Sequence, residues 1–278
     1  FNDIDAYSFS SSISVIGEND ISKRNANHLE DLLFIAPNVN YSSGASRGKF
    51  YQIRGIGERS EFTEPVNYSV GVIIDGIDFT GIALGASTFD VKQIEVLRGP
   101  QGTLYGANAL AGLINIVSND PTEDFYSEIS GSISEFGGRD FGIILSNSND
   151  NNFGYRLGFK NSKSDGFIKN VYLNRDDTND IDETISRAKF TKNNATAKLT
   201  LNIFYADIDN GYDAFSLDNT RTTYSDEPGY DRQKTTAAST KFEKTLGNSH
   251  IIEILASFAD SELGYAYDED WSNTRICN

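Results

Sequence analysis

The 278-residue sequence has no methionine, one cysteine, one tryptophan and two histidines. Because Cys277 stands alone, no disulfide can form within the chain and no site of several cysteines can bind a metal. His28 and His250 lie far apart in the sequence with no ligand cluster around them, which argues against a zinc site. A chain without methionine does not start at its initiator, so we expect a processed product or a fragment.

Positive charge and long apolar runs are also scarce. The formal net charge is −16 and the pI is about 4.5, so a polyanion such as nucleic acid would be repelled. A solvated surface is the simplest interpretation of this acidity. No stretch approaches the roughly 20 apolar residues of a membrane helix, and no secretory signal opens the chain. Membrane barrels stay possible, because alternating strands average out in hydropathy.

Glycine and aromatic residues are abundant, and they favour strands and turns over helix bundles. In the first 120 residues, short apolar runs that end at turn formers predict strands at 12–17, 50–55, 70–76, 93–99 and 112–118. Apolar residues at helical spacing before Pro37 predict one amphipathic helix at 27–37. Together these elements predict a compact α+β domain, with 56–69 and 77–90 as candidate functional loops.

After about Pro121 the pattern changes to a period of two. Between 153 and 160, Phe153, Tyr155, Leu157 and Phe159 share one face, and glycines and basic residues share the other. About seven such strands are visible. Short turns at 149–152, 193–194 and 247–249 alternate with long acidic connections at 162–184, 207–234 and from 261 onward. This asymmetry favours an outer-membrane barrel over a soluble β-sandwich, which would also alternate.

The glycine run at 96–117, "VLRGPQGTLYGANALAGLINIV", fits no enzymatic template. It contains neither a dinucleotide fingerprint nor a phosphate loop, and the chain has no nucleophile elbow. Asp75 and Asp78 in "DGID" are interpreted as part of a turn, and the acidic segment 174–183 lacks calcium-loop spacing. Glycines in such a run allow positive φ and close backbone approach, which predicts a tightly packed strand–turn–strand unit.

Three segments carry a family resemblance: "QIRGIGERSEF", "VGVIIDGID" and "FDVKQIEVLRGPQGTLYGANALAGLINIVS". In order and spacing, residues 10–121 closely resemble the plug domain of TonB-dependent outer-membrane receptors. The resemblance implies a plug at 1–121 inside a barrel of about 22 strands. We expect residues 122–278 to supply about the first third of that barrel, because the 157 residues after Pro121 are too few for the whole.

The resemblance also implies a function and partners. A receptor of this family sits in the bacterial outer membrane and imports a large, scarce solute, most commonly a ferric siderophore, when TonB with ExbB and ExbD rearranges the plug. We expect the TonB-contacting segment to be missing from this chain. The implied protein is a transporter with a lipid environment, and it needs neither an enzymatic cofactor nor covalent catalysis.

Site residues follow from matching positions in the family. Arg54 in "QIRG" and Arg98 in "VLRG" match plug arginines that pair with glutamates on the inner barrel wall, on later strands. Arg47, Lys49, Arg59, Glu61 and Phe62, with the 77–85 loop, are expected near the plug apex. Basic and aromatic side chains there would suit an anionic ferric chelate; contact with barrel wall or water alone is the equally weighted alternative.

Two other classes of protein stay open. A soluble carbohydrate-binding or adhesive β protein would explain the strands and acidic loops but not the plug-like motif. A polysaccharide-processing enzyme would need converging carboxylates, which a sequence does not place.

Overall fold

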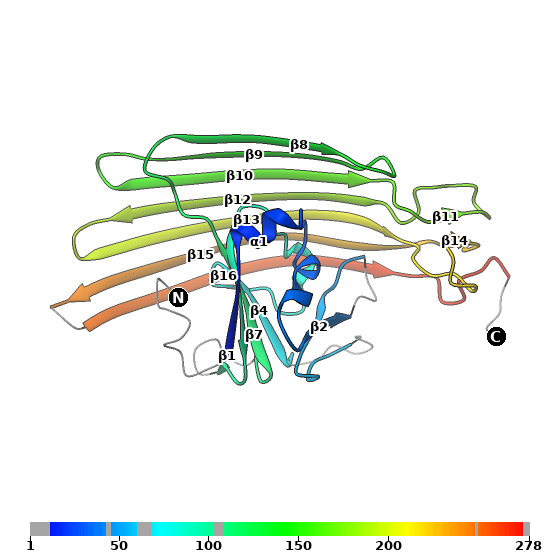
Figure 1. The fold of residues 1–278 in the computed structure, drawn as a ribbon, viewed down its shortest axis with the longest axis horizontal. Coiled ribbons are helices and arrows are strands. Elements are labelled where there is room, and N and C mark those ends of the chain that lie inside the picture. The colour runs from blue at the N-terminus through cyan, green and yellow to red at the C-terminus, as the bar shows by residue number, and fades with distance from the viewer. Residues whose placement is uncertain (1–11, 43–45, 60–67, 103–107, 248–249, 275–278) are drawn as a thin grey trace. The chain divides into compact units, whose positions relative to one another are not determined.

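The computed structural model describes residues 12–42, 46–59, 68–102, 108–247 and 250–274 (Figure 1). The chain divides into two compact units, Phe1–Asp120 with Leu255–Ser257 and Pro121–Ile254 with Phe258–Asn278. The first unit carries a mixed sheet with short helices, and the second carries a long antiparallel sheet. The expected combination of a small α+β domain and antiparallel strands is confirmed.

A five-stranded sheet organises the first unit. Its order is β1-β6-β7-β4-β5, in which β4 and β7 are parallel and the other neighbours are antiparallel. The strands are β1 (Ser12–Gly17), β4 (Val70–Ile74), β5 (Ile77–Asp78), β6 (Val91–Arg98) and β7 (Gly112–Ser118). A separate antiparallel pair joins β2 (Val39–Ser42) to β3 (Phe50–Ile53). Strands therefore lie at all five predicted places.

The predicted α-helix at 27–37 is wrong. The segment forms two 3-10 turns, η2 (Leu29–Asp31) and η3 (Leu33–Ile35), in which Leu32 N donates to Leu29 O at 3.1 Å and Ile35 N to Leu32 O at 3.0 Å. Leu29, Leu32 and Leu33 are fully buried. Apolar residues three apart fit a 3-10 turn as well as an α-helix, so the spacing could not separate the two.

One α-helix lies in the described part of this unit, α1 (Glu18–Lys23), which was not predicted. Only Ile21 of its six residues is buried, so the sequence carries no helical apolar period there. A third 3-10 turn, η4 (Ala83–Gly85), lies in the predicted loop at 77–90. None of the helices in the described part of the chain is long and apolar enough to span a membrane.

Gly112 shows what the glycine run provides. It pairs with Arg98 across β6 and β7 and has a φ of +156°. A Cβ atom at this position would lie 2.4 Å from Leu97 O and 2.6 Å from Ile53 Cδ1. Both neighbours are buried, so a larger residue would force main chain apart. The tight packing expected of this run is confirmed at Gly112, whereas residues 103–107 lie outside the described residues.

The "DGID" segment is the turn that the sequence predicted. Ile74 pairs with Ile77, which leaves Asp75 and Gly76 as the two turn residues, with φ of 49° and 80°. Asp75 Oδ1 accepts a hydrogen bond from Ser118 N at 2.9 Å, and Asp78 Oδ1 accepts one from Thr80 N at 2.9 Å. Both carboxylates thus accept main-chain hydrogen bonds, Asp75 from the end of β7 and Asp78 from within its own loop.

Seven antiparallel strands build the second unit, as predicted. Their order is β16-β15-β13-β12-β10-β9-β8, so each large strand pairs with the large strands next to it in the sequence (Figure 1). The strands are β8 (Tyr126–Ile133), β9 (Arg139–Ser148), β10 (Phe153–Ser164), β12 (Ile181–Asn193), β13 (Ala197–Tyr212), β15 (Gly229–Leu246) and β16 (His250–Ala266). Several are longer than the roughly 10 residues expected.

The two faces of this sheet differ in chemistry. Direct pairing aligns one row of apolar residues across four strands: Leu157, Ala188, Ile203 and Ala238. The next row points to the opposite face and contains Gly158, Arg187, Phe204 and Ala237. Ile203 is 42% exposed, whereas Arg187 is 7% and Phe204 is 3% exposed. Apolar side chains therefore line the exposed face, whereas the buried face mixes apolar side chains with charged and polar ones such as Arg156, Arg187 and Asn202.

Two of the three described connections at one end of the sheet are long, the exception being the tight turn at 134–138, and those at the other end are short. Residues 165–180 and 213–228 form the long ones, which are shorter than predicted because the strands continue further. Within them, β11 (Lys169–Asn170) and β14 (Thr222–Thr223) pair in parallel. Both small strands lie beyond the ends of the long strands (Figure 1, right).

Candidate functional site

The predicted apical residues occupy different environments in the first unit. Arg47 and Lys49 lie just before β3, and Arg59 lies after it. Arg47 and Lys49 are partly buried, whereas Arg59 is exposed and makes no side-chain hydrogen bond or ion pair with another described residue. Glu61 and Phe62 lie outside the described residues. Of the predicted apical residues that the structure describes, Arg47 and Lys49 are thus partly buried and Arg59 is open to solvent.

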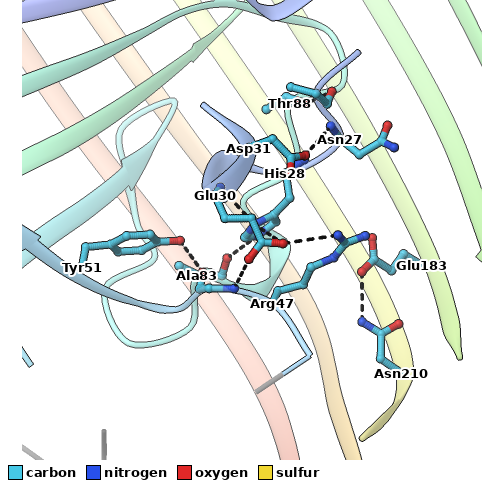
Figure 2. Close-up of polar contacts among 12 residues, drawn as sticks. Asn27, His28, Glu30, Asp31, Arg47, Tyr51, Ala83, Thr88, Glu183 and Asn210 are labelled. Carbon is cyan, nitrogen blue, oxygen red and sulfur yellow. Dashed lines mark hydrogen bonds and ion pairs between the residues drawn. The ribbon is translucent and has the colours of Figure 1, made fainter. Parts of the chain in front are cut away.

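Glu30 is the centre of the polar contacts around Arg47 (Figure 2). Its Oε1 lies 3.4 Å from Arg47 Nη1, and its Oε2 accepts a hydrogen bond from Gly48 N. Both side chains of the ion pair are about 15% exposed, so solvent screens the pair only partly. A Cβ at position 48 would lie 2.5 Å from the Tyr41 ring, so glycine permits this close approach.

His28 fixes the 3-10 turn that carries Glu30. His28 N donates to Asp31 Oδ2 at 3.0 Å, while the ring Nδ1 accepts a hydrogen bond from Glu30 N at 3.4 Å. The other ring nitrogen, Nε2, lies 3.1 Å from Ala83 O. Since a carbonyl only accepts and Nδ1 is itself an acceptor, the proton is assigned to Nε2. The histidine thus joins η2 to η4 and is part of the packed interior.

Tyr51 holds the other side of the 46–48 segment. Its hydroxyl donates to Gly48 O at 2.6 Å, and the residue is 3% exposed. Burial, assisted by the negative charge of Glu30, raises the pKa of Tyr51 well above its usual value. The hydroxyl therefore stays protonated and remains a donor. Gly48 is held through both its N–H and its carbonyl group.

Sequence reasoning selected Arg47 but missed Glu30, Tyr51 and His28. Glu30 stands among the leucines of "NHLEDLLF", where a charged residue is expected on the solvated side of a helix. Its partner is 17 residues away and follows from the tertiary fold alone. A capping signal existed at His28 and Asp31, three residues apart, but histidine is uncommon in that role.

Arg98 lies inside the first unit. It is 7% exposed; Nε and Nη2 donate to Pro37 O at 3.1 and 2.9 Å, and Nη2 also donates to Ser14 Oγ at 2.9 Å. Burial lowers the pKa of Arg98, and the nearby positive charge of Arg54 lowers it further. No carboxylate among the described residues forms an ion pair with Arg98.

Arg54 differs from Arg98 in its surroundings. It is exposed, has a φ of 55°, and uses its main-chain N–H to donate to Asn38 O at 2.8 Å. Its guanidinium makes no ion pair with a described carboxylate. The two arginines lie close enough for their charges to interact, which is unfavourable without an acidic group nearby.

Comparisons with known proteins agree with these features. The family description "TonB-dependent Receptor Plug Domain" matches residues 5–113. The pesticin receptor of Yersinia pestis is 31% identical over 124 residues, which cover 44% of this chain and 18% of that receptor. The catecholate siderophore receptor Fiu of Escherichia coli K12 is 34% identical over 121 residues, which cover 44% of this chain and 15% of that protein. The aligned part is thus less than a fifth of these relatives.

A solved structure extends the likeness over both units. The ferric yersiniabactin uptake receptor FyuA from Yersinia pestis superposes with a TM-score of 0.79 at 20% identity, covering 94% of this chain and 42% of FyuA. At this identity the likeness concerns the fold. It includes the long antiparallel sheet, which the family description does not reach.

The contacts of Glu30 lead to a test. Glu30→Ala removes the acceptor of Gly48 N and the partner of Arg47, and a lost charged hydrogen bond costs roughly 1–3 kcal/mol. We expect main-chain amides in 46–51 to exchange with deuterium about 5- to 100-fold faster in the full-length protein, measured by mass spectrometry. Glu18→Ala, which removes an exposed carboxylate from α1, should leave that exchange unchanged. Equal exchange in both variants would contradict the role given to Glu30.

Proposed function

Since this chain belongs to the TonB-dependent receptors, with their plug domain at residues 5–113, we propose that it imports a large, scarce solute across the bacterial outer membrane. The proposed cargo is a ferric siderophore or another iron complex. The supporting observation is the combination of a plug fold with an antiparallel sheet whose exposed face is apolar. We assign residues 1–121 to the plug and 122–278 to the wall of the receptor.

The length and chemistry of the strands support a membrane location. Sixteen residues of β13 extend over about 53 Å at roughly 3.3 Å per residue, more than the ~30 Å of hydrocarbon that a tilted strand crosses. The exposed apolar residues cover only part of each strand. In β13 they are Leu199, Leu201 and Ile203, and Asp207 and Asp209 follow toward the long connection. A lipid-embedded band with a hydrated extension accounts for this order.

The plug supports a transport mechanism without covalent chemistry. Force supplied by TonB, with ExbB and ExbD, rearranges the plug and releases the bound solute into the periplasm. The first unit suits such a step, because its 46–48 segment is held by a few polar contacts that can break and form again. The curated relatives aligned with the plug are receptors, which agrees with a role other than catalysis.

A ferric siderophore fits the basic character of the proposed apex. Iron-chelate complexes often carry negative charge, and arginine binds anions through strong hydrogen bonds. Arg59 is the candidate whose side chain is exposed without a described partner, whereas Arg47 would have to leave Glu30 or bind as part of that pair. Lys49, Glu61 and Phe62 complete the proposed contacts. Fiu and FyuA are named for a catecholate siderophore and for ferric yersiniabactin, which supports the same class of cargo.

A soluble carbohydrate-binding β protein is the rival function. It would need the apolar face of the sheet to be covered by another layer of protein. Leu157, Leu199, Ile203, Ile254 and Phe258 on this sheet are between 38% and 64% exposed, which does not favour such a covering layer. We therefore favour the membrane receptor.

The cargo is tested by uptake. A strain that lacks its own siderophore and carries the full-length receptor should accumulate iron from one member of a panel of iron-labelled siderophores, and should lose this uptake when tonB is deleted. Arg59→Ala should weaken binding of that siderophore about 10-fold or more, the usual cost of a lost charge-assisted hydrogen bond.

Two controls make this experiment decisive. Arg24→Ala removes an exposed arginine that lies over the Phe34 ring, and it should leave uptake unchanged. If iron uptake is the same with and without the receptor, the proposed cargo is wrong. If uptake depends on the receptor but Arg59→Ala binds normally, the apical role of Arg59 is wrong and the cargo stands.

We propose that Arg54 and Arg98 hold the plug by pairing with glutamates on the inner face of the receptor wall, on strands later than those of this chain. Arg54 gives the cleaner test, because its side chain makes no hydrogen bond or ion pair within the described part of the plug, whereas changing Arg98 would also break its bonds to Pro37 and Ser14. Arg54→Glu in the full-length receptor should raise entry of large antibiotics several-fold in growth assays. Arg24→Glu serves as the charge-matched control, and equal leakage in both strains would count against the pairing.

A further inference from the structure

Two residues of the first unit that are distant in the sequence are joined beside the proposed apical arginine. Ser69 lies eleven positions after Glu58 and immediately before β4. Its N–H donates to the two carboxylate oxygens of Glu58 at 3.1 and 3.2 Å, and its hydroxyl donates to Oε1 at 2.8 Å. We term this pair the apical clasp. Its carboxylate is partly buried, and hydrogen bonds to a charged acceptor are stronger than those between neutral groups.

The Glu58 end of the clasp is held against β3. Gln52, which is 5% exposed, donates from Nε2 to the main-chain oxygen of Glu58. Gly57 has a φ of +146°, and a Cβ atom at this position would lie 2.1 Å from Tyr51 O. A larger residue would collide with main chain there, so glycine is what lets the chain fold back on β3. Glu58 is therefore fixed at its main chain as well as at its carboxylate.

The Ser69 end of the clasp is held by two other segments. Ala111 N donates to Ser69 O at 2.8 Å, which ties the clasp to the glycine run. Tyr68 N donates to Asn108 Oδ1 at 3.2 Å, and a Cβ atom on Gly81 would lie 2.6 Å from the Tyr68 ring. Both candidate functional loops and the glycine run thus meet at residues 68–69.

The clasp also occupies the charge that stands next to Arg59 in the sequence. Arg59 follows Glu58 directly, yet it forms no ion pair with any described carboxylate. A carboxylate released from Ser69 would be free to pair with the adjacent guanidinium and to compete with an anionic solute. Because both carboxylate oxygens of Glu58 are bonded to Ser69, the guanidinium stays available.

We propose that Glu58 is a positioning residue for anion binding at the plug apex. Its carboxylate fixes the main chain beside Arg59 and leaves the guanidinium free. The arginine then meets an anionic iron chelate with less order left to be lost on binding. This inference rests on the proposed function, since it takes Arg59 as a contact of the solute. It adds a residue that acts through Arg59 without touching the solute.

The positioning is tested first without any solute. A nitroxide is attached at Arg59→Cys in a full-length receptor whose other cysteines are replaced by serine. Glu58→Ala should shorten the rotational correlation time of the label, because the clasp is lost. Glu58→Gln keeps an acceptor oxygen for Ser69 and should stay close to the unsubstituted receptor, and Glu18→Ala should leave the spectrum unchanged. Equal spectra for Glu58→Ala and Glu18→Ala would overturn the proposal.

The second measurement is the affinity for a defined anion. Ferric tris(catecholate), an anionic iron chelate, is titrated onto the full-length receptor with its native Arg59, and bound iron is measured by equilibrium dialysis. Glu58→Ala should weaken binding about 3- to 10-fold, the cost of ordering one flexible side chain, and Glu58→Gln by less than about 2-fold. In an Arg59→Ala background, Glu58→Ala should have no further effect, because it acts through the arginine.

The outcomes separate this inference from the proposed cargo. If Glu58→Ala tightens binding in both backgrounds, Glu58 acts only as a repelling charge and the positioning role is wrong. If it weakens binding equally with and without Arg59, its effect is on the plug as a whole, which also overturns the proposal. If the chelate does not bind the unsubstituted receptor while the spectra change as expected, the anionic cargo is wrong and Glu58 still positions residue 59.

Discussion

The register of the long strands is the constraint on which the account of the second unit depends. Pairing places Leu157, Ala188, Ile203 and Ala238 in one row and Arg187 and Phe204 in the next row on the opposite face. A slip of one residue in any strand would move its apolar side chains to the polar face and bring charged ones into their place. Because several paired strands share the same alternation, each pairing supports the next. The result is a sheet that presents apolar side chains outward, a surface that suits lipid better than water.

The first unit depends on the close approach of main chain. Gly112 lies where a Cβ would touch Leu97 O, and Gly48 lies against the Tyr41 ring. Main-chain groups contribute to the satisfaction of two of its charges: Glu30 accepts from Gly48 N, and Arg98 donates to Pro37 O. The buried Glu95 accepts instead from the side-chain amide of Asn115. Such contacts make the unit compact and leave few charged pairs to stabilise each segment. In the proposed function the plug must stay closed and yet rearrange under force. Compact packing keeps it closed, and the small number of ion pairs lets its segments rearrange.

The sequence predicted the elements whose signal is local. Period-two alternation located the seven strands, and the Asp75–Gly76 turn followed from its dipeptide. The prediction from sequence failed at 27–37, where apolar residues three apart fit both a 3-10 turn and an α-helix. It also failed at α1, where a single buried residue, Ile21, leaves no helical apolar period. The contacts between Glu30 and Arg47, and between Asn170 and Asp213, join residues 17 and 43 positions apart. No local pattern encodes such pairs, because they form only after the strands on either side have aligned. Arg98 could be chosen by its motif, but its bonds to Ser14 and Pro37 could not.

Site-directed spin labelling along β13, in the full-length receptor in lipid bilayers, tests the central claim most directly. Nitroxides are placed one at a time at positions 199 to 204, and their collision rates with oxygen, which concentrates in lipid, are compared. The account predicts high oxygen accessibility at 199, 201 and 203 and low accessibility at 200, 202 and 204, which is a clear period of two. Uniform accessibility along the strand, or collision with a water-soluble reagent at 201 and 203, would contradict it.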